Sequence, residues 1–144
     1  MFRYENSNTI FSVSTTYNFS SADELLLLNL ATKHESGSAR ICLHTHQAKT
    51  TQNMIICLQK HRAFAAHYHP DGKSESYTVL RGKLYIEQLK RNGDHLRTIV
   101  LTSGNSPYMH QGMQTHRTYT LDEHCIYQEV YHGSFDKSND VIYI

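Results

Sequence analysis

Three residues close together in the chain have the types and spacing of a metal site. His67 and His69 are separated by one residue, and Glu75 follows a Pro-Asp-Gly turn at residues 70–72. Alternate residues of a strand point to the same face, so both imidazoles would project together. A hairpin at the turn would bring Glu75 back beside them. Two imidazoles and a carboxylate are ligands for a divalent transition metal, and a third imidazole from a distant strand would complete the site.

Composition limits the class of protein. The 144 residues suit a single domain with its own core. The formal net charge of +1 provides no basic field for nucleic acid or for an anionic membrane surface. The longest apolar run, at residues 25–31, is too short to span a bilayer, and the N-terminus has no secretory signal pattern. We therefore expect a cytoplasmic protein that binds neither nucleic acid nor membranes.

The elements that must position these residues are mostly strands. One helix is predicted from Ser21, which forms a capping-box pattern with Glu24, and it ends near Gly37. β-branched and aromatic residues at 8–19 indicate a strand before this helix. After residue 39, short β-rich runs alternate with turn sequences. The predicted strands cover residues 40–45, 53–60, 62–68, 75–80, 83–90, 95–102, 115–120 and 124–131.

The turn sequences favour an antiparallel sandwich or barrel. Asn92-Gly93 lies between two β-rich runs and predicts a hairpin with a type I′ turn. The chain has no internal repeat and no linker. We predict one domain over residues 1–144, composed of an N-terminal strand and helix (1–38), a β-barrel (39–135) and a C-terminal tail (136–144).

The order of the motifs resembles a known family. His67-x-His69, Glu75 and Gly82 resemble the first motif of the cupins. In particular, the chain is similar to the WbuC-type cupin-fold metalloproteins of bacterial surface-polysaccharide (O-antigen) biosynthesis. This similarity rests on "ARICLH", "QNMIICL", "HYHP", "SESYTVLRG" and "YQEVYHGSF", which follow the "DELLLL" helix in this order. The resemblance implies a mainly β fold, the cupin double-stranded β-helix or jelly-roll barrel, with one N-terminal helix.

The resemblance also implies a second motif that supplies one more histidine. Counting back from Glu129 places His116 at that position, whereas His110 competes because it closely follows a proline. Two spacings depart from the family pattern: five residues rather than three or four separate His69 from Glu75, and Pro-x-Gly-x-x-His is replaced by "SPYMHQGMQTH". The predicted metal ligands are His67, His69, Glu75 and His116, with His110 as the alternative to His116.

Three imidazoles and one carboxylate leave one or two positions open on a six-coordinate ion, which is typical of a catalytic site. Zn, Fe, Mn, Ni and Co all suit this ligand set. The sequence identifies no catalytic residue. The predicted pocket-lining residues are Tyr77, Tyr127, Gln128, His110 and His124.

These observations predict a metal-binding cupin that acts on or binds a small polar molecule. The resemblance implies a sugar or nucleotide-sugar in surface-polysaccharide biosynthesis, and, for an enzyme, an isomerase or epimerase, a lyase or an oxygenase. Two alternatives stay open: a non-catalytic carbohydrate-binding or regulatory module, and a metal-free sugar-nucleotide epimerase. The resemblance further implies a homodimer, with residues 8–14 as a candidate pairing segment.

Overall fold

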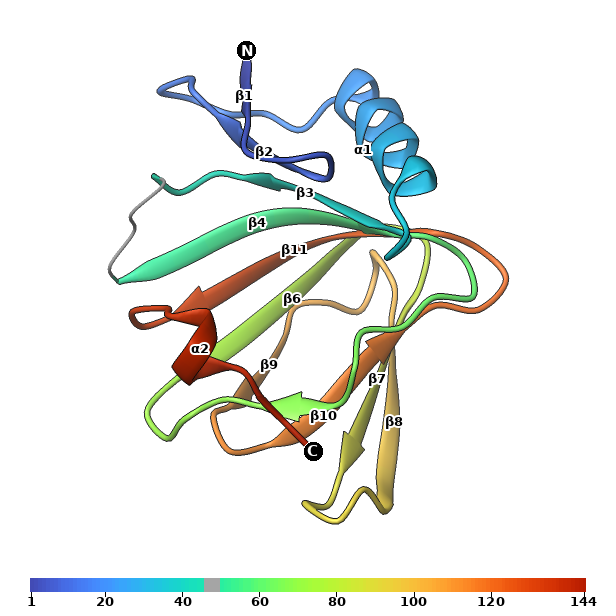
Figure 1. Ribbon diagram of the computed structural model, residues 1–144. Coiled ribbons are helices and arrows are strands. Elements are labelled where there is room, and N and C mark those ends of the chain that lie inside the picture. Colours follow the sequence, from blue (N-terminus) through green and yellow to red (C-terminus); the bar gives the residue numbers. More distant parts are fainter. Residues whose placement is uncertain (46–49) are drawn as a thin grey trace.

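The computed structural model describes residues 1–45 and 50–144, which form two facing β-sheets with a helix packed outside them (Figure 1). The elements are β1 (Phe2–Tyr4), β2 (Thr9–Ser12), α1 (Ser21–Lys33), β3 (Ser38–Cys42), β4 (Thr51–Leu58), β5 (His67–Tyr68), β6 (Ser74–Arg81), β7 (Leu84–Leu89), β8 (His95–Leu101), β9 (Tyr108–Gln111), β10 (Thr115–Tyr119), β11 (Cys125–His132), α2 (Lys137–Asp140) and β12 (Ile142–Tyr143). Over these residues, one sheet has the strand order β1-β2-β3-β4-β11-β6-β9 and the other has the order β12-β5-β10-β7-β8. Neighbouring strands that are distant in the sequence are typical of a jelly roll.

The apolar run in β4 is explained by cover on both faces of the seven-stranded sheet. Met54, Ile56 and Leu58 belong to the core between the two sheets, whereas Ile55 and Cys57 belong to the cluster that packs against α1. A strand covered on both sides can be apolar at every position. The alternation therefore identifies which side chains of this sheet face the interior of the sandwich.

The N-cap of helix α1 lies one residue before the predicted capping residue, Ser21. Ser20 is the N-cap, and its side chain accepts a hydrogen bond from the backbone N–H of Asp23 at 3.2 Å. The Asp23 carboxylate accepts from the backbone N–H of Ser20 at 3.2 Å. The predicted pair of Ser21 and Glu24 was wrong by one position. Both pairs have the same spacing, so the local sequence did not distinguish them.

The end of the chain folds onto the barrel. Residues 136–144, predicted as a tail, contain α2 and β12. In the register of β12 and β5, Tyr143 pairs with His67 and Ile142 with Tyr68. This segment therefore lies against the strand that carries the first predicted ligand.

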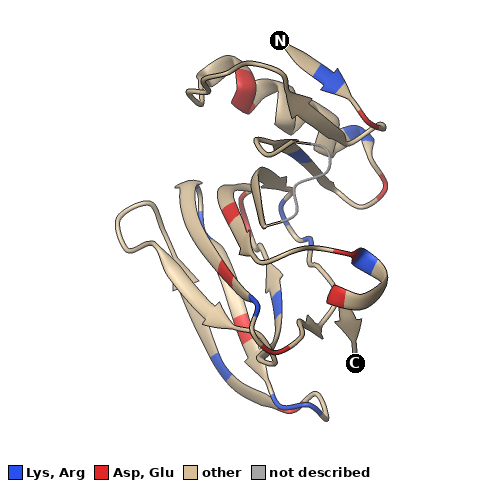
Figure 2. Cartoon of the chain, turned by 90° about the vertical axis from the view of Figure 1, so that its left-hand side faces the viewer, with Lys and Arg blue, Asp and Glu red and all other residues tan. Residues whose placement is uncertain are grey.

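The outer surface carries charges of both signs. Figure 2 shows acidic and basic residues interspersed along the strands of the described chain. β2 pairs with both β1 and β3, so residues 9–12 lie inside a sheet rather than at its edge. The homodimer stays a prediction. Among the described residues, no helix combines the length and apolar character needed to cross a membrane.

Candidate metal centre

The four predicted ligands meet between the two sheets. His67 and His116 are register partners on β5 and β10 of the five-stranded sheet. Glu75 lies on β6 of the seven-stranded sheet, and His69 lies just after β5. Each of the four residues offers one ligand atom, and these atoms all lie within 4.8 Å of one another. The group therefore has the size of a single coordination sphere.

The connection from His69 to Glu75 crosses between the sheets and is not the predicted hairpin. β5 pairs with β10 and β12, whereas β6 pairs with β11 and β9. The turn at residues 70–72 carries the chain from one sheet to the other, and Gly72 adopts a φ of +82° there. Inner side chains of stacked sheets point toward each other across the core. Because of this crossover, the ligands come from both sheets and face one another in the core. A hairpin would have placed them side by side in one sheet.

Backbone carbonyls orient all three imidazoles in the same way. In each ring, Nδ1 contacts a carbonyl oxygen, which can only accept a hydrogen bond, so the proton of the neutral ring is on Nδ1. The contacts are His67 Nδ1 to Ala65 O at 2.8 Å, His69 Nδ1 to Asp140 O at 2.6 Å and His116 Nδ1 to Gln114 O at 2.9 Å. Each Nε2 then has a free lone pair. Carbonyl acceptors of this kind commonly fix the tautomer of metal-binding histidines.

The buried Glu75 carboxylate lies at the centre of these nitrogens. His69 Nε2 lies 2.7 Å from Oε1, and His116 Nε2 lies 3.4 Å from Oε2. Tyr77 donates a hydrogen bond from its hydroxyl to Oε2. Glu75 is only 3% exposed, and a buried carboxylate facing nitrogen lone pairs requires a cation between them. Either a proton or a metal ion can fill that role.

The residues fit a divalent metal ion. His69 Nε2 is buried without a hydrogen-bond partner among the described residues, although it lies so close to the Glu75 carboxylate. A misaligned N···O contact of this length is poor geometry for a proton, whereas a metal ion between the two atoms would satisfy both. Three neutral imidazoles and a carboxylate suit Zn, Fe, Mn, Ni or Co.

Burial and charge keep most of this group in the form that a metal needs. Burial and the neighbouring His116 lower the pKa of His67 to about 4. Burial opposes ionisation of Glu75, but close contacts with the imidazoles of His110, His116 and His69 hold its pKa well below the ordinary range. Burial also disfavours a charged His69, yet the close contact with Glu75 and the negative charge of that carboxylate raise the pKa of His69 above the ordinary value. Metal uptake should therefore displace a proton mainly from His69.

The metal-free protein should lose stability as the pH falls from about 6.5 to about 4. The pKa of His67 is about 6.5 in the unfolded chain and about 4 in the fold, so the unfolded state binds more protons in that window. At ~1.4 kcal/mol per pKa unit, the loss amounts to a few kcal/mol. Thermal unfolding of chelator-treated wild type and His67→Gln across this range would measure it. A His67→Gln protein with the same pH dependence as wild type would contradict the assignment.

Metal should stabilise the protein at pH 7.5, and this stabilisation should vanish in acid. A ligand that binds only the folded state raises the unfolding free energy, and protons compete with the metal for the histidines. The melting temperatures of metal-loaded and metal-free samples should therefore converge below pH ~6.5, the ordinary histidine pKa. Identical melting temperatures at pH 7.5 would count against a metal site.

His110 lies beside the centre on a strand. Residues 108–111 form β9, a strand that was not predicted from the sequence, and His110 is the register partner of Glu75 there. β9 satisfies the backbone groups at the free edge of β6. His110 Nε2 lies 3.3 Å from Glu75 Oε2, and neither ring nitrogen has a hydrogen-bond partner among the described residues. His110 is outside the group of four, so the choice of His116 stays a prediction with a close neighbour as its rival.

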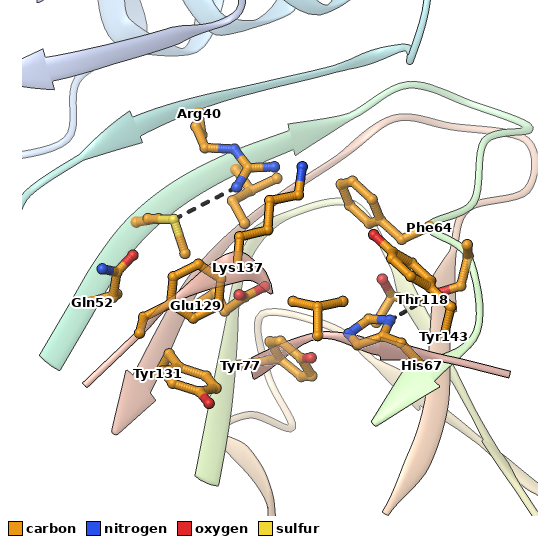
Figure 3. A pocket seen from close by; sticks show the side chains of 15 residues that line it. Arg40, Gln52, Phe64, His67, Tyr77, Thr118, Glu129, Tyr131, Lys137 and Tyr143 are labelled. Carbon is orange, nitrogen blue, oxygen red and sulfur yellow. Dashed lines mark hydrogen bonds between the residues drawn. The ribbon is translucent and has the colours of Figure 1, made fainter. Parts of the chain in front are cut away.

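A cavity of about 290 Å³ adjoins the centre (Figure 3). His67 and Tyr77 form the part of its wall that belongs to the metal centre. Polar groups of its remaining wall come from β3, β4, β10, β11 and the end of the chain: Arg40, Gln52, Thr118, Glu129, Tyr131, Lys137 and Tyr143. The centre therefore opens onto a space of small-molecule size.

Of the predicted pocket residues, Tyr77 lines this cavity and the other four lie elsewhere. Tyr127 is fully buried in the apolar core between the sheets. Gln128 points the other way from β11 and donates a hydrogen bond to a β4 side chain at 2.8 Å. His124 lies 3.9 Å from a carboxylate of α1, and His110 contacts Glu75.

Strand alternation could have identified part of the cavity wall that the sequence analysis missed. Tyr127 faces inward, so Glu129 and Tyr131 must face inward too along the same strand. By the same rule, Arg40 shares the inner face of β3 with Cys42, which belongs to the core between the sheets. The residues contributed by the end of the chain had no such signal, because their elements are too short for a periodic pattern.

The chain matches the model of one known protein family. A model described as "Domain of unknown function (DUF6016)" matches residues 25–101. The chain belongs to this family. No curated protein matches the sequence.

The solved structures that resemble this one share its architecture. A conserved Klebsiella pneumoniae protein with a double-stranded β-helix domain has a TM-score of 0.62 and 14% identity, over 90% of this chain and 99% of that one. L-ribose isomerase of Cellulomonas parahominis has a TM-score of 0.55 and 12% identity, over 67% of this chain and 59% of that one. Oxalate decarboxylase of Bacillus subtilis has a TM-score of 0.53 and 19% identity, over 65% of this chain and 24% of that one.

These similarities confirm the predicted fold class, which is the cupin double-stranded β-helix. At such low identities they show the fold alone. This chain spans only about three fifths of the length of the isomerase and about a quarter of the length of the decarboxylase. The narrower resemblance to the WbuC-type proteins stays a prediction.

Proposed function

We propose that this cupin is a metal-dependent enzyme that moves a proton on a carbon atom of a small polar substrate such as a sugar, as isomerases and epimerases do. One observation carries the proposal. The half-buried carboxyl group of Glu129 lines the same cavity as His67 and makes no side-chain hydrogen bond among the described residues. A carboxyl group beside a metal centre and free of other partners is placed to exchange a proton with a substrate.

The environment of Glu129 suits this role. Burial and the charge of Glu75 raise the pKa of Glu129 to about 8, against the opposing effects of Arg40 and His69. A general acid or base works best when its pKa lies near the operating pH. Strongly shifted carboxyl groups in a cavity mark candidate catalytic residues.

The other cavity residues have supporting roles. Tyr77 holds the Glu75 carboxylate through its hydroxyl and faces the cavity as well. The Tyr131 side chain lines the cavity, and its buried hydroxyl has no hydrogen-bond partner among the described residues. A divalent ion, when bound, polarises a carbonyl or hydroxyl oxygen and so acidifies the neighbouring C–H bond. Glu129 would remove or return that proton.

Three further points support a small sugar as the substrate. The chain shares its fold with L-ribose isomerases, and a similar oxalate decarboxylase has Mn(II) centres. The resemblance to WbuC-type proteins suggests surface-polysaccharide biosynthesis. A cavity of about 290 Å³ is just below the usual range for ligand pockets, roughly 300–1,000 Å³, so it favours a sugar over a whole nucleotide-sugar.

The test begins with protein purified without added metal. Elemental analysis should find about one divalent transition metal per chain. The protein is then incubated with aldopentoses and aldohexoses in D2O, and deuterium incorporation next to the carbonyl carbon is followed by NMR. Exchange that stops on chelation supports the proposal. Exchange that survives chelation would indicate a metal-free epimerase, and a ligand-induced thermal shift without exchange would indicate a binding module.

Glu129→Gln should reduce the exchange rate by about 10²-fold, the lower end of what proton transfer by a positioned side chain contributes. The variant keeps the shape of the side chain and should keep the metal. Gln128→Asn is the control. It changes a side chain on the opposite face of β11 without adding a charge. If Glu129→Gln exchanges deuterium as fast as wild type, Glu129 has no role in proton transfer.

A further inference from the structure

Two positively charged side chains share the cavity wall. Arg40 comes from β3 and Lys137 from α2, and both line the cavity. Among the described residues, neither side chain has a carboxylate within ion-pair distance. The one hydrogen bond that the Arg40 side chain donates to a described residue is a weak contact of 3.9 Å with Met54 Sδ. A guanidinium has five N–H donors, so most of the hydrogen-bonding capacity of Arg40 is unused.

The cavity offers little negative charge to balance these cations. Within the part of the chain that the structure describes, Glu129 is the one carboxyl group on its wall. In the metal-free protein, burial raises the pKa of Glu129 to about 8, which favours the neutral form of this carboxyl group at pH 7. Arg40 is partly buried, and a partly buried cation without a counter-charge is costly unless an anion binds to it.

The positions of these groups divide the cavity into two ends. In Figure 3, the charged tips of Arg40 and Lys137 lie toward one end, and His67 lies toward the other. The wall of the same cavity also includes apolar side chains, namely Met54, Ile56, Phe64 and Val141. A molecule that spans this distance would meet cations at one end and the metal centre at the other.

We infer that the substrate of this enzyme is a small sugar-like molecule that carries an acidic oxyanion, a phosphate monoester or a carboxylate, which binds at Arg40 and Lys137. The inference rests on the proposed function, since it assumes that the other end of the molecule meets the metal centre. Arg is suited to this task because its planar N–H groups match a carboxylate or phosphate in pairs. Lys137, which is exposed on α2, adds a second charge at the cavity mouth.

The inference can be tested with D-ribose and two anionic counterparts, D-ribose 5-phosphate and D-ribonate. Metal-loaded wild type is titrated with each probe by calorimetry. At least one anionic probe should bind ~10-fold to 100-fold more tightly than ribose, the difference that hydrogen bonds to charged groups typically make. The stronger of the two anions identifies phosphate or carboxylate as the recognised group.

Two double variants separate the cation pair from the metal. Arg40→Met/Lys137→Met should bind the preferred anion no more tightly than ribose, and should keep its metal. Lys60→Met/Lys83→Met removes the same charge outside this cavity and should keep the preference. Circular dichroism and metal content are recorded for each protein, and Arg40→Lys provides a milder change should the double variant unfold.

Each outcome has a distinct meaning. If wild type binds metal but prefers neither anion over ribose, or binds none of the probes, the anion site is refuted and the metal centre is not. If the preference survives in Arg40→Met/Lys137→Met, the anion binds at the metal and the inference is wrong. If wild type holds no metal, the proposed function itself fails.

Discussion

Replacing His67 and His69 together by alanine should give a folded barrel that retains no stoichiometric metal. The double change removes two of the three imidazole nitrogens that converge on Glu75. Changes to residues that only support metal ligands weaken binding by 10-fold to 100-fold, so the loss of two ligands should exceed ~10⁴-fold. Elemental analysis after dialysis measures the metal, and circular dichroism measures the fold.

The fold should survive this change because the apolar core lies elsewhere. The core between the sheets is built from residues such as Ile56, Leu84 and Ile86, none of which belongs to the metal centre. His95→Ala/His132→Ala is the matched control, since both side chains are exposed outside the centre, and it should retain the metal. A wild type that binds no metal under any loading condition, or a His67→Ala/His69→Ala protein that binds as much as wild type, would refute the site.

Local sequence was sufficient for the ligand types but not for their arrangement. The His-x-His spacing and the strand period place His67 and His69 together, as the structure does. The sequence between His69 and Glu75 indicates a turn, but a turn does not specify whether the chain returns to the same sheet. Strand pairing decides this, and it is a long-range property. The prediction of a hairpin between His69 and Glu75 was wrong for that reason.

In the rest of the fold, too, the sequence predicts local features but not those that depend on long-range contacts. The hairpin at Asn92-Gly93 is present, because β7 and β8 pair on either side of it. Only Gly93, however, has positive φ, so the turn is not the predicted type I′, and the register shifts at Leu89 instead. Short elements such as β9, α2 and β12 were missed because tertiary contacts rather than periodic patterns hold them.

The residues that give the cavity its chemistry were the hardest to predict. Glu129 and Arg40 occupy inward positions that a strict strand register reveals, but a single charged residue in a strand does not by itself indicate a site. Lys137 reaches the cavity only because α2 packs against the barrel. The carbonyl of Asp140 in the same helix orients His69. The end of the chain thus connects the metal centre to the proposed anion site.

His116→Ala should lose the metal during dialysis, whereas His110→Ala should retain it. His116 shares one coordination sphere with the other three ligands, and its Nδ1 is anchored to the Gln114 carbonyl at 2.9 Å. His110 contacts Glu75 at 3.3 Å from outside that sphere, and neither of its ring nitrogens is anchored to a described residue. We expect an affinity loss of roughly 10³-fold or more for His116→Ala, and a loss within the 10-fold to 100-fold range of supporting residues for His110→Ala.

The two variants control for each other, because both rings are buried and their centroids lie only 4.1 Å apart. Each alanine leaves a space of similar size, so a general loss of stability would affect both proteins alike. Competition with a chelator of known affinity gives the two dissociation constants. If His110→Ala loses the metal and His116→Ala keeps it, the ion is bound on the β9 side of Glu75. The cavity would then face a different part of the coordination sphere, and the position proposed for the reacting end of the substrate would have to move with it.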